Sequence, residues 1–344
     1  MPNNPGCGRA FWTVVCVVLG LVLTGLIAAT VYAYYILNLM PRDTGEIKEP
    51  PTKEQIEELM KEETIPDNVS TAPVVREEDV DWGEEVVDVI ETDDNIVNFM
   101  LIGQDARSNG ELARSDSMIL VTINKEAKTI TLTSFLRDLY VKIPGYGDNK
   151  MNAAYALGGM KLLNETLEQN FGVQVEGNVE VNFNHFAEVI DALGGVDMEL
   201  RQDEAGYINI GTGRYVLGSG MQHLDGEQAL FYSRIRHLDA DADFSRTNRQ
   251  RKVINALIEK FRSTDVMTLM GLLKDILPMI TTDLRNSEII DYATDLLPIL
   301  ADCKVVSQRV PADGKYYFAT INQMSCVVAD MDAARELLKQ TMGE

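Results

Sequence analysis

The sequence lacks the signatures of several large enzyme classes. Its three histidines, His185, His223 and His237, are widely spaced, and there is no HExxH pair and no Cys-His metal set. No Walker loop or Rossmann glycine fingerprint follows a predicted strand, and the segment Gly211 to Gly213 is predicted to be a turn. The Gly-x-Ser-x-Gly motif of many hydrolases is also absent. Zinc peptidase, nucleotide-binding and serine hydrolase functions are therefore disfavoured.

Positive charge is scarce as well, because the formal net charge is −22. The segment from Pro41 to Asp94 carries nineteen acidic residues against five basic ones, with almost no aromatic residue. Such a composition cannot bury a core, so residues 38–94 are predicted to form an acidic flexible linker. An acidic chain with no helix-turn-helix signature is not expected to bind nucleic acid.

Cysteine is rare, with four in 344 residues. Cys303 and Cys326 lie in the C-terminal part of the chain. They could form a disulfide if this part lies outside the cytoplasm, or they could be two reduced core cysteines. The sequence leaves both alternatives open.

One long hydrophobic run is present, from Phe11 to Leu37, and it carries no charged residue. Its length suits a bilayer, and Trp12 and three tyrosines mark its ends. The run is too long for a cleaved signal peptide. We therefore expect a cytoplasmic segment at residues 1–10, a transmembrane signal anchor at residues 11–37, and an extracytoplasmic body in the cell membrane.

From Asn95 onward the pattern predicts one large α/β domain, with a mixed central β-sheet and helices on both faces. Residues 95–262 form its core, and residues 263–344 form a helical and strand part of the same domain. The loop from Asp203 to Arg214 is expected to be irregular. Strands are predicted at 95–102, 117–123, 129–135, 179–181, 196–200 and 304–310, with a short one near Cys326, and helices at 152–170, 186–193, 226–235, 244–261, 266–280 and 287–300, with a last one from Met331.

Arginines are concentrated between Tyr232 and Lys252, in the sequence YSRIRHLDADADFSRTNRQRK. One predicted helix delivers Arg234 and Arg236, and the next begins with Arg246, Arg249 and Gln250. Guanidinium groups and a helix N-terminus both suit phosphate. The alternative is that these arginines form ordinary surface ion pairs with nearby aspartates.

Charged residues of both signs follow the upstream strands. Asp105 and Asp116 could approach one another and hold Mg²⁺, or each could cap a turn or pair with Arg107 or Arg114. Arg137 lies just after a strand, where a long side chain can cross the sheet edge, or Arg137 and Asp138 could form an ordinary surface pair. Lys150, before a predicted helix, is compatible with phosphate contact and equally with capping. Together these residues favour chemistry on a phosphate ester.

Seven motifs follow one another in order: GQDAR, ARSDS, SFLRDLYVKIPG, KMNAAYALGG, DALGGVDMEL, HLDGEQALFYSRIRH and DFSRTNRQRKVINAL. This set, from about Asn95 to Phe261, resembles the LytR-CpsA-Psr family of cell-wall glycopolymer ligases. The resemblance implies an extracytoplasmic enzyme that moves an anionic glycan, such as teichoic acid or capsule, from a polyprenyl-pyrophosphate carrier onto peptidoglycan. One departure is Leu136, which stands where family members commonly have proline.

The resemblance also implies roles for individual residues. Asp105 and Asp116 would hold Mg²⁺, Arg137 would act in catalysis, and Asp105 is a candidate base. The helices from Val253 through Ile280 are candidates to line an apolar slot for the polyprenyl chain, although such helices more often form core. The pyrophosphate would be surrounded by Arg107, Arg114, Arg137, Lys150, Arg234, Arg236, Arg246, Arg249 and Gln250.

Two alternative functions remain open. A membrane-tethered sensor or regulatory protein could bind the same lipid-linked precursors without turnover. A pyrophosphatase could use water in place of the sugar hydroxyl at the same site.

Overall fold

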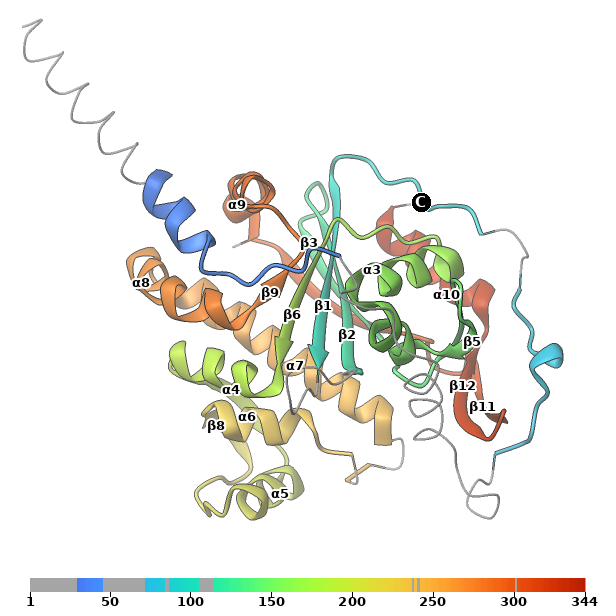
Figure 1. Cartoon of the computed structure of the whole chain (residues 1–344). Helices are drawn as coiled ribbons and strands as arrows, with labels where there is room; N and C mark the ends of the chain where they lie inside the picture. Colours follow the sequence, from blue (N-terminus) through green and yellow to red (C-terminus); the bar gives the residue numbers. More distant parts are fainter. Residues whose placement is uncertain are drawn as a thin grey trace, which may run out of the picture.

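The computed structural model describes residues 30–45, 72–83, 87–104, 114–236, 238–239, 242–300 and 302–343. A six-stranded mixed sheet forms the centre, in the order β10-β3-β2-β1-β6-β9 (Figure 1). Strands β1, β2 and β3 form an antiparallel meander, whereas β1 pairs with β6 and β3 pairs with β10 in parallel. The strands are β1 (Ile96–Gln104), β2 (Ser115–Asn124), β3 (Thr129–Phe135), β6 (Gly177–Asn182), β9 (Thr281–Thr282) and β10 (Lys304–Val310).

Helices cover both faces of this sheet, as the sequence predicts. Alternation along β2 sends Met118 and Leu120 into one hydrophobic cluster and Ile119 and Ile123 into another. The first cluster lies under α3 (Met151–Phe171) and α10 (Met331–Met342), and the second under α7 (Ala242–Ser263) and α9 (Asn286–Leu300). Figure 1 shows the two helical layers on either side of the strands.

A smaller lobe packs against α7 beyond the lower end of the sheet in Figure 1. It has its own core, which includes Ile190, Ile208 and Tyr232. Its strands β7 and β8 pair only with each other among the described residues, so β7 does not join the central sheet. The lobe consists of α4 (Phe183–Ala192), β7 (Val196–Leu200), α5 (Gln202–Thr212), β8 (Gly220–Leu224) and α6 (Gly226–Ser233), with α8 (Val266–Ile276) beside it.

The prediction of an irregular loop from Asp203 to Arg214 is wrong, because α5 occupies most of it. Its Glu204 side chain accepts a hydrogen bond from the backbone N–H of Arg201 at 2.9 Å, which caps the helix. The helix ends at Gly213, whose φ of 69° is left-handed. The predicted turn at residues 211–213 is therefore the end of a helix.

Two hairpins complete the domain, and the sequence analysis identified one of their four strands. They are β4 (Tyr140–Ile143) with β5 (Gly147–Lys150), and β11 (Tyr316–Ile321) with β12 (Met324–Ala329). A bridge between Leu139 and Val327 joins them, and Tyr140, Ala319 and Cys326 share a hydrophobic cluster. Short 3-10 turns occur at Glu77–Asp79 and Leu277–Met279.

The predicted linker is partly wrong, because both of its described ends pack against the domain. Arg42 forms a β-bridge with Thr282 and donates a hydrogen bond to the Leu284 carbonyl at 2.5 Å. Val80 and Ile90 are buried, and Trp82 stacks on Tyr140 at 5.7 Å between ring centroids. A few apolar residues within an acidic segment are thus enough to attach it to the surface.

The predicted anchor lies outside the described residues except for residues 30–37, which are helical. Among the helices that the structure describes, none has the length and apolar character needed to cross a bilayer.

The Cys303–Cys326 disulfide is not formed, and both thiols are buried. Cys303 packs beneath α9 with Ile130 and Leu296, whereas Cys326 packs with Tyr140 in the hairpin cluster. The two thiols belong to separate hydrophobic clusters, so the alternative in which they form a disulfide is wrong.

Candidate active site

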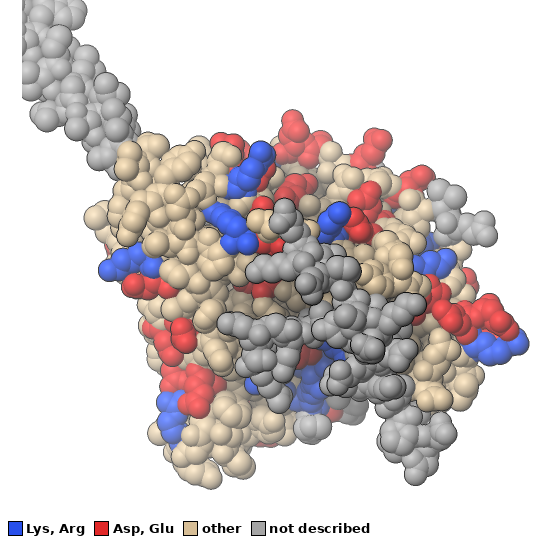
Figure 2. All heavy atoms as spheres, viewed as in Figure 1, with Lys and Arg blue, Asp and Glu red and all other residues tan. Residues whose placement is uncertain are grey.

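Several of the predicted site residues lie at one edge of the central sheet. Strands β1, β3, β6 and β10 run in the same direction, so their carboxyl ends lie at this edge together with the start of β2. Figure 2 shows Lys and Arg side chains gathered in the lower middle of the molecule, below the lower end of the strands in Figure 1. Open α/β sheets commonly bind ligands at the carboxyl ends of their strands.

Asp116 connects two of the predicted arginines. Arg137 Nη1 donates a hydrogen bond to Asp116 Oδ1 at 3.0 Å, and Arg246 Nη1 lies 3.7 Å from the same oxygen. Arg137 follows β3, Asp116 lies on β2, and Arg246 lies in the first turns of α7. The fold therefore brings together three predicted residues that are far apart in the sequence.

A second carboxylate, Asp138, joins Lys150 to this cluster. Lys150 Nζ lies 3.1 Å from Asp138 Oδ1, and Arg137 Nε lies 3.4 Å from Asp138 Oδ2. Lys150 is 5% exposed, and it is the last residue of β5, directly before α3. Three cations and two carboxylates thus give the described cluster a net positive charge, which suits an anionic ligand.

The pKa of Asp138 lies below its usual range. Burial acts against ionisation, but the charges of Lys150, Arg137 and Arg246 outweigh it and hold the carboxyl ionised. Because the folded-state pKa is lower than the unfolded one, this carboxylate stabilises the protein above about pH 4, and the contribution is lost as the pH falls through the folded pKa.

We expect the free energy of unfolding to fall on acidification below about pH 4, and Asp138→Asn to flatten part of that dependence. Urea unfolding between pH 3 and pH 7 measures both slopes. Asp332→Asn is a matched control, since the Asp332 side chain is 59% exposed and also pairs with an arginine, Arg335. Identical slopes for Asp138→Asn and the unchanged protein would contradict the assignment.

Arg234 and Arg236 lie at the end of α6, where the chain leaves that helix. The guanidinium of Arg234 lies over the ring of Phe183 at 4.7 Å from its centroid. Arg114 is the residue before β2. Asp105 and Arg107 lie outside the described residues, which end on this side at Gln104 and resume at Arg114.

Arg249 has a different environment from the one predicted. Its Nε donates to Glu204 Oε1 at 2.9 Å, and its Nη2 pairs with Asp239. The side chains of Arg249 and Glu204 are 3% and 4% exposed, so this is a buried ion pair between α7 and α5. Its charge is already balanced by two carboxylates, which supports a structural role.

Sequence analysis missed a buried acid beside the site, Glu180 on β6. Gln104 and the hydroxyl of Tyr155 both donate hydrogen bonds to its carboxyl group. Burial raises the pKa of Glu180 above its usual range. Glu180 thus holds the side chain of Gln104, the residue directly before Asp105. Its position on a short predicted strand offered no signal for this contact.

An apolar cavity of about 260 Å³ adjoins the cluster, between the sheet and helices α4 and α7. Gln250, one turn after Arg246 on α7, lies in its wall. Ile254, Leu257, Phe261 and Ile280 belong to the segment predicted to line an apolar slot, and they lie in the wall of this cavity. The other walls were not predicted, and they are Leu101, Ile102, Gly103, Ser117, Ile119, Val179, Val181, Phe183, Phe186, Val189 and Ser233.

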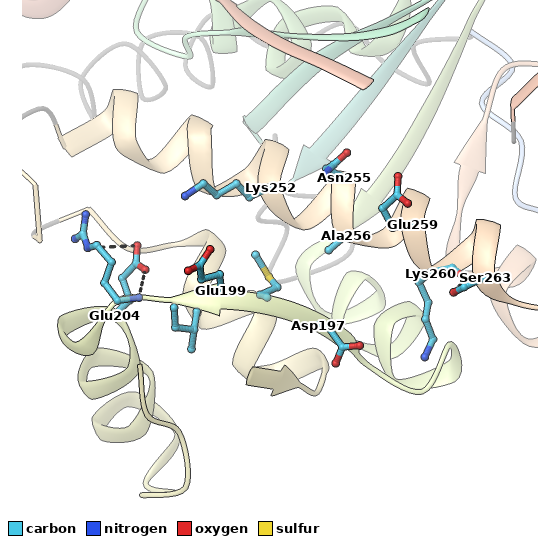
Figure 3. A pocket seen from close by; sticks show the side chains of 12 residues that line it. Asp197, Glu199, Glu204, Lys252, Asn255, Ala256, Glu259, Lys260 and Ser263 are labelled. Carbon is cyan, nitrogen blue, oxygen red and sulfur yellow. Dashed lines mark hydrogen bonds and ion pairs between the residues drawn. The ribbon is translucent and has the colours of Figure 1, made fainter. Parts of the chain in front are cut away.

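A larger cavity, of about 720 Å³, lies between α7 and β7 and contains neither the arginine cluster nor the apolar slot. Figure 3 shows Lys252, Asn255 and Glu259 of α7 across from Glu199 and Asp197 of β7. Both acidic and basic side chains line this cavity, and the cavity is open to solvent. Size alone therefore does not identify the site in this protein.

Among the described residues, Asp116 is the predicted Mg²⁺ ligand at the sheet edge, and it already pairs with Arg137. Asp116 offers carboxylate oxygens, its side chain is 18% exposed, and the cation-rich surroundings would hold phosphate oxygens nearby. Mg²⁺ commonly binds one or two carboxylates and takes the remaining ligands from phosphate and water. Within the described residues there is no group of three or more His, Cys, Asp or Glu side chains that could hold a metal by themselves.

The sequence of this chain matches a known protein family and several of its relatives. The model of the LytR_cpsA_psr family matches residues 59–341. The polyisoprenyl-teichoic acid–peptidoglycan teichoic acid transferase TagT of Bacillus subtilis (strain 168) is 37% identical over 234 residues, which are 64% of this chain and 71% of that protein. The corresponding transferase TagU of Oceanobacillus iheyensis is 37% identical over 212 residues, which are 60% of this chain and 64% of that protein.

Solved structures also align with this chain. TagT bound to LI-WTA aligns with a TM-score of 0.61 and 30% identity over 77% of this chain and 99% of that chain. The family protein YwtF (TagT) with bound octaprenyl pyrophosphate lipid aligns with a TM-score of 0.56 and 27% identity over 79% of this chain and 99% of that chain. Since the family model covers most of the sequence, the protein belongs to the LytR_cpsA_psr family.

Proposed function

We propose that the protein is a phosphotransferase that moves an anionic glycopolymer from a polyprenyl-pyrophosphate carrier to peptidoglycan. The observation that carries this proposal is the juxtaposition of a cationic cluster with an apolar cavity. Arg137, Arg246 and Lys150 suit a pyrophosphate, and the cavity beneath Gln250 suits the adjoining isoprenoid chain. The names of the TagT and TagU relatives support the same substrate class.

The proposed reaction is a substitution at phosphorus. A hydroxyl oxygen of the acceptor sugar attacks the glycan-proximal phosphorus and forms a new P–O bond. The bond from this phosphorus to the bridging oxygen breaks, and polyprenyl phosphate leaves with the electron pair. The hydroxyl proton passes to a base, for which Asp105 is our assignment. Arg137 and Arg246 neutralise the charge that develops on the phosphoryl oxygens.

We include Mg²⁺, held by Asp105 and Asp116, as part of this proposal. When bound, the ion would neutralise charge on the pyrophosphate oxygens. Arg137 would then have two functions, because its hydrogen bond orients Asp116 while its positive charge lies beside the proposed position of the pyrophosphate.

The direct test incubates the full-length chain with a lipid-linked glycan, peptidoglycan and Mg²⁺. Mass analysis of the product should show a new phosphodiester between glycan and peptidoglycan. Binding of the lipid-linked glycan without any product would contradict the transferase and favour a sensor. Release of free glycan phosphate in place of the conjugate would favour a pyrophosphatase.

The cavity gives a prediction about lipid binding. Ile254→Trp places an indole in the cavity, so we expect binding of a polyprenyl pyrophosphate to weaken by about tenfold or more, since each excluded CH₂ group costs about 0.8 kcal/mol. Binding of inorganic pyrophosphate should not change. Titration calorimetry measures both. Met267→Trp is the control, because Met267 is 80% exposed on α8; equal effects of the two variants would exclude the cavity as the lipid site.

We further propose that residues 11–37 anchor the protein in the cell membrane, with the domain on the extracytoplasmic side. The uncharged run and the lipid-linked substrate class support this location. Protease added outside spheroplasts should then digest the domain. Complete protection of the domain, with digestion only after lysis, would place it inside.

A further inference from the structure

One arginine of α7 has no role in the mechanism above. Arg251 is 6% exposed, and neither its Nε nor its Nη1 has a hydrogen-bond partner among the described residues. A buried guanidinium without a carboxylate is costly, because the lost hydration is not replaced. A site for an external anion accounts for such a group.

A second arginine increases the local positive charge. Arg309, on β10, lies close enough that burial and its like charge together lower the pKa of Arg251 to about 10. Arg309 pairs with Asp313, whose side chain is 93% exposed. Ser134, the register partner of Arg309 on β3, is 1% exposed and its hydroxyl also lacks a described partner. Among the described residues, the exposed carboxylate of Asp313 is the only ion-pair partner of Arg309, and Arg251 has none.

Aromatic rings extend this feature to the surface. The guanidinium of Arg309 lies over Phe244 at 4.1 Å from the ring centroid. Tyr316 and Phe318 of β11 lie 4.6 Å and 6.1 Å from the Phe244 centroid, and Phe318 is 50% exposed. Exposed aromatic rings offer a large apolar area to the C–H face of a sugar ring. Arginines beside them add recognition of a negative substituent.

The feature adjoins the catalytic cluster but is separate from it. Phe244 and Arg251 lie on either side of Arg246 along α7, and Ser134 precedes Arg137 by three residues. Arg251 and Arg309 make no described ion pair with Asp116 or Asp138. A glycan whose pyrophosphate lies at Arg137 and Arg246 can therefore continue across Phe244.

We propose that Arg251, Arg309, Phe244, Tyr316 and Phe318 form a subsite for a phosphorylated sugar of the transferred glycan. The phosphate lies against the two arginines, and the sugar ring packs on the aromatic side chains. The assignment of this sugar to the donor glycan rests on the proposed function. The recognition of a sugar phosphate by these residues does not depend on the proposed function.

The test uses the full-length chain and N-acetylglucosamine 6-phosphate as the probe. We expect Arg251→Gln and Arg309→Gln each to weaken its Kd by about tenfold or more. Phe318→Ser should reduce the saturation transfer from protein to the sugar protons. Tyr317→Ser is the matched control, because Tyr317 is 43% exposed on the same strand but faces the opposite side of β11.

Further measurements separate this inference from a structural role and from the catalytic site. The Tm of Arg251→Gln should equal or exceed that of the unchanged protein, because an unpartnered buried charge is removed. Arg137→Ala should retain probe binding. Unchanged binding in both arginine variants, or loss of binding in Arg137→Ala, would overturn the subsite.

Two probes test which sugar is bound. N-acetylmuramic acid, which carries a carboxylate, represents the peptidoglycan acceptor, and tighter binding of this probe would overturn the assignment to the donor. If inorganic phosphate bound as tightly as N-acetylglucosamine 6-phosphate, the proposed role of the aromatic side chains would be wrong. Probe binding in a protein that shows no transfer would leave the subsite in place while the proposed function fails.

Discussion

Arg137→Ala is expected to reduce transfer by about two to three orders of magnitude, the range found when one preorganised donor is removed from a developing oxyanion. Arg137 connects Asp116, at 3.0 Å, to Asp138, at 3.4 Å, so its loss removes a cation from the cluster and one cationic partner from each carboxylate. Production of the glycan–peptidoglycan phosphodiester, measured at saturating lipid-linked glycan, reports the effect on kcat.

Two variants make this result specific. Arg285→Ala removes an exposed arginine that pairs with Glu288, and it should transfer at the normal rate. Arg137→Lys keeps the charge but loses the planar pair of donors, so it should recover only part of the rate. Normal transfer by Arg137→Ala would remove this residue from the active site and with it the proposed position of the pyrophosphate.

Glu204→Ala is expected to lower the free energy of unfolding by about 3 kcal/mol or more, because it leaves the buried guanidinium of Arg249 short of one carboxylate. The two side chains are 3% and 4% exposed and lie 2.9 Å apart. Glu204 also caps α5 through the backbone N–H of Arg201. Urea unfolding with an unchanged m-value measures the loss.

The matched control is Glu288→Ala, which breaks an ion pair on the surface of α9. Exposed pairs contribute about 0 to 1 kcal/mol, so this variant should stay within that range. Combining Glu204→Leu with Arg249→Met should recover stability relative to Glu204→Ala, because no unbalanced charge remains inside. A loss below 1 kcal/mol in Glu204→Ala would show that Asp239 alone balances Arg249.

Arg246 and Arg249 illustrate what a sequence pattern cannot separate. Both lie in the same basic run and in the first turns of the same helix, and sequence analysis assigned both to the pyrophosphate. In the structure Arg246 faces Asp116, whereas Arg249 turns toward Glu204 and Asp239 in the smaller lobe. Two side chains three positions apart on a helix can contact different neighbours, and only the packing of the helix shows which neighbours these are.

Two further predictions from the sequence were wrong for similar reasons. The segment from Asp203 to Arg214 was predicted to be a loop, with a turn at residues 211–213, yet Ala205 and Ile208 pack into the smaller lobe and stabilise α5. The acidic composition of residues 38–94 suggested a free linker, yet Val80, Trp82 and Ile90 contact the domain. In both cases burial of a few apolar groups outweighed an unfavourable average composition.

The sequence by itself determined the order and type of most strands and helices, since apolar periodicity records which face of each element is buried. It also determined the family, through motifs such as SFLRDLYVKIPG and DFSRTNRQRKVINAL. Only the tertiary structure decided which charges meet. Ion pairs such as Arg137–Asp116 and Arg249–Glu204 join residues 21 and 45 positions apart, and their distances depend on the strand register and helix packing that local sequence does not encode.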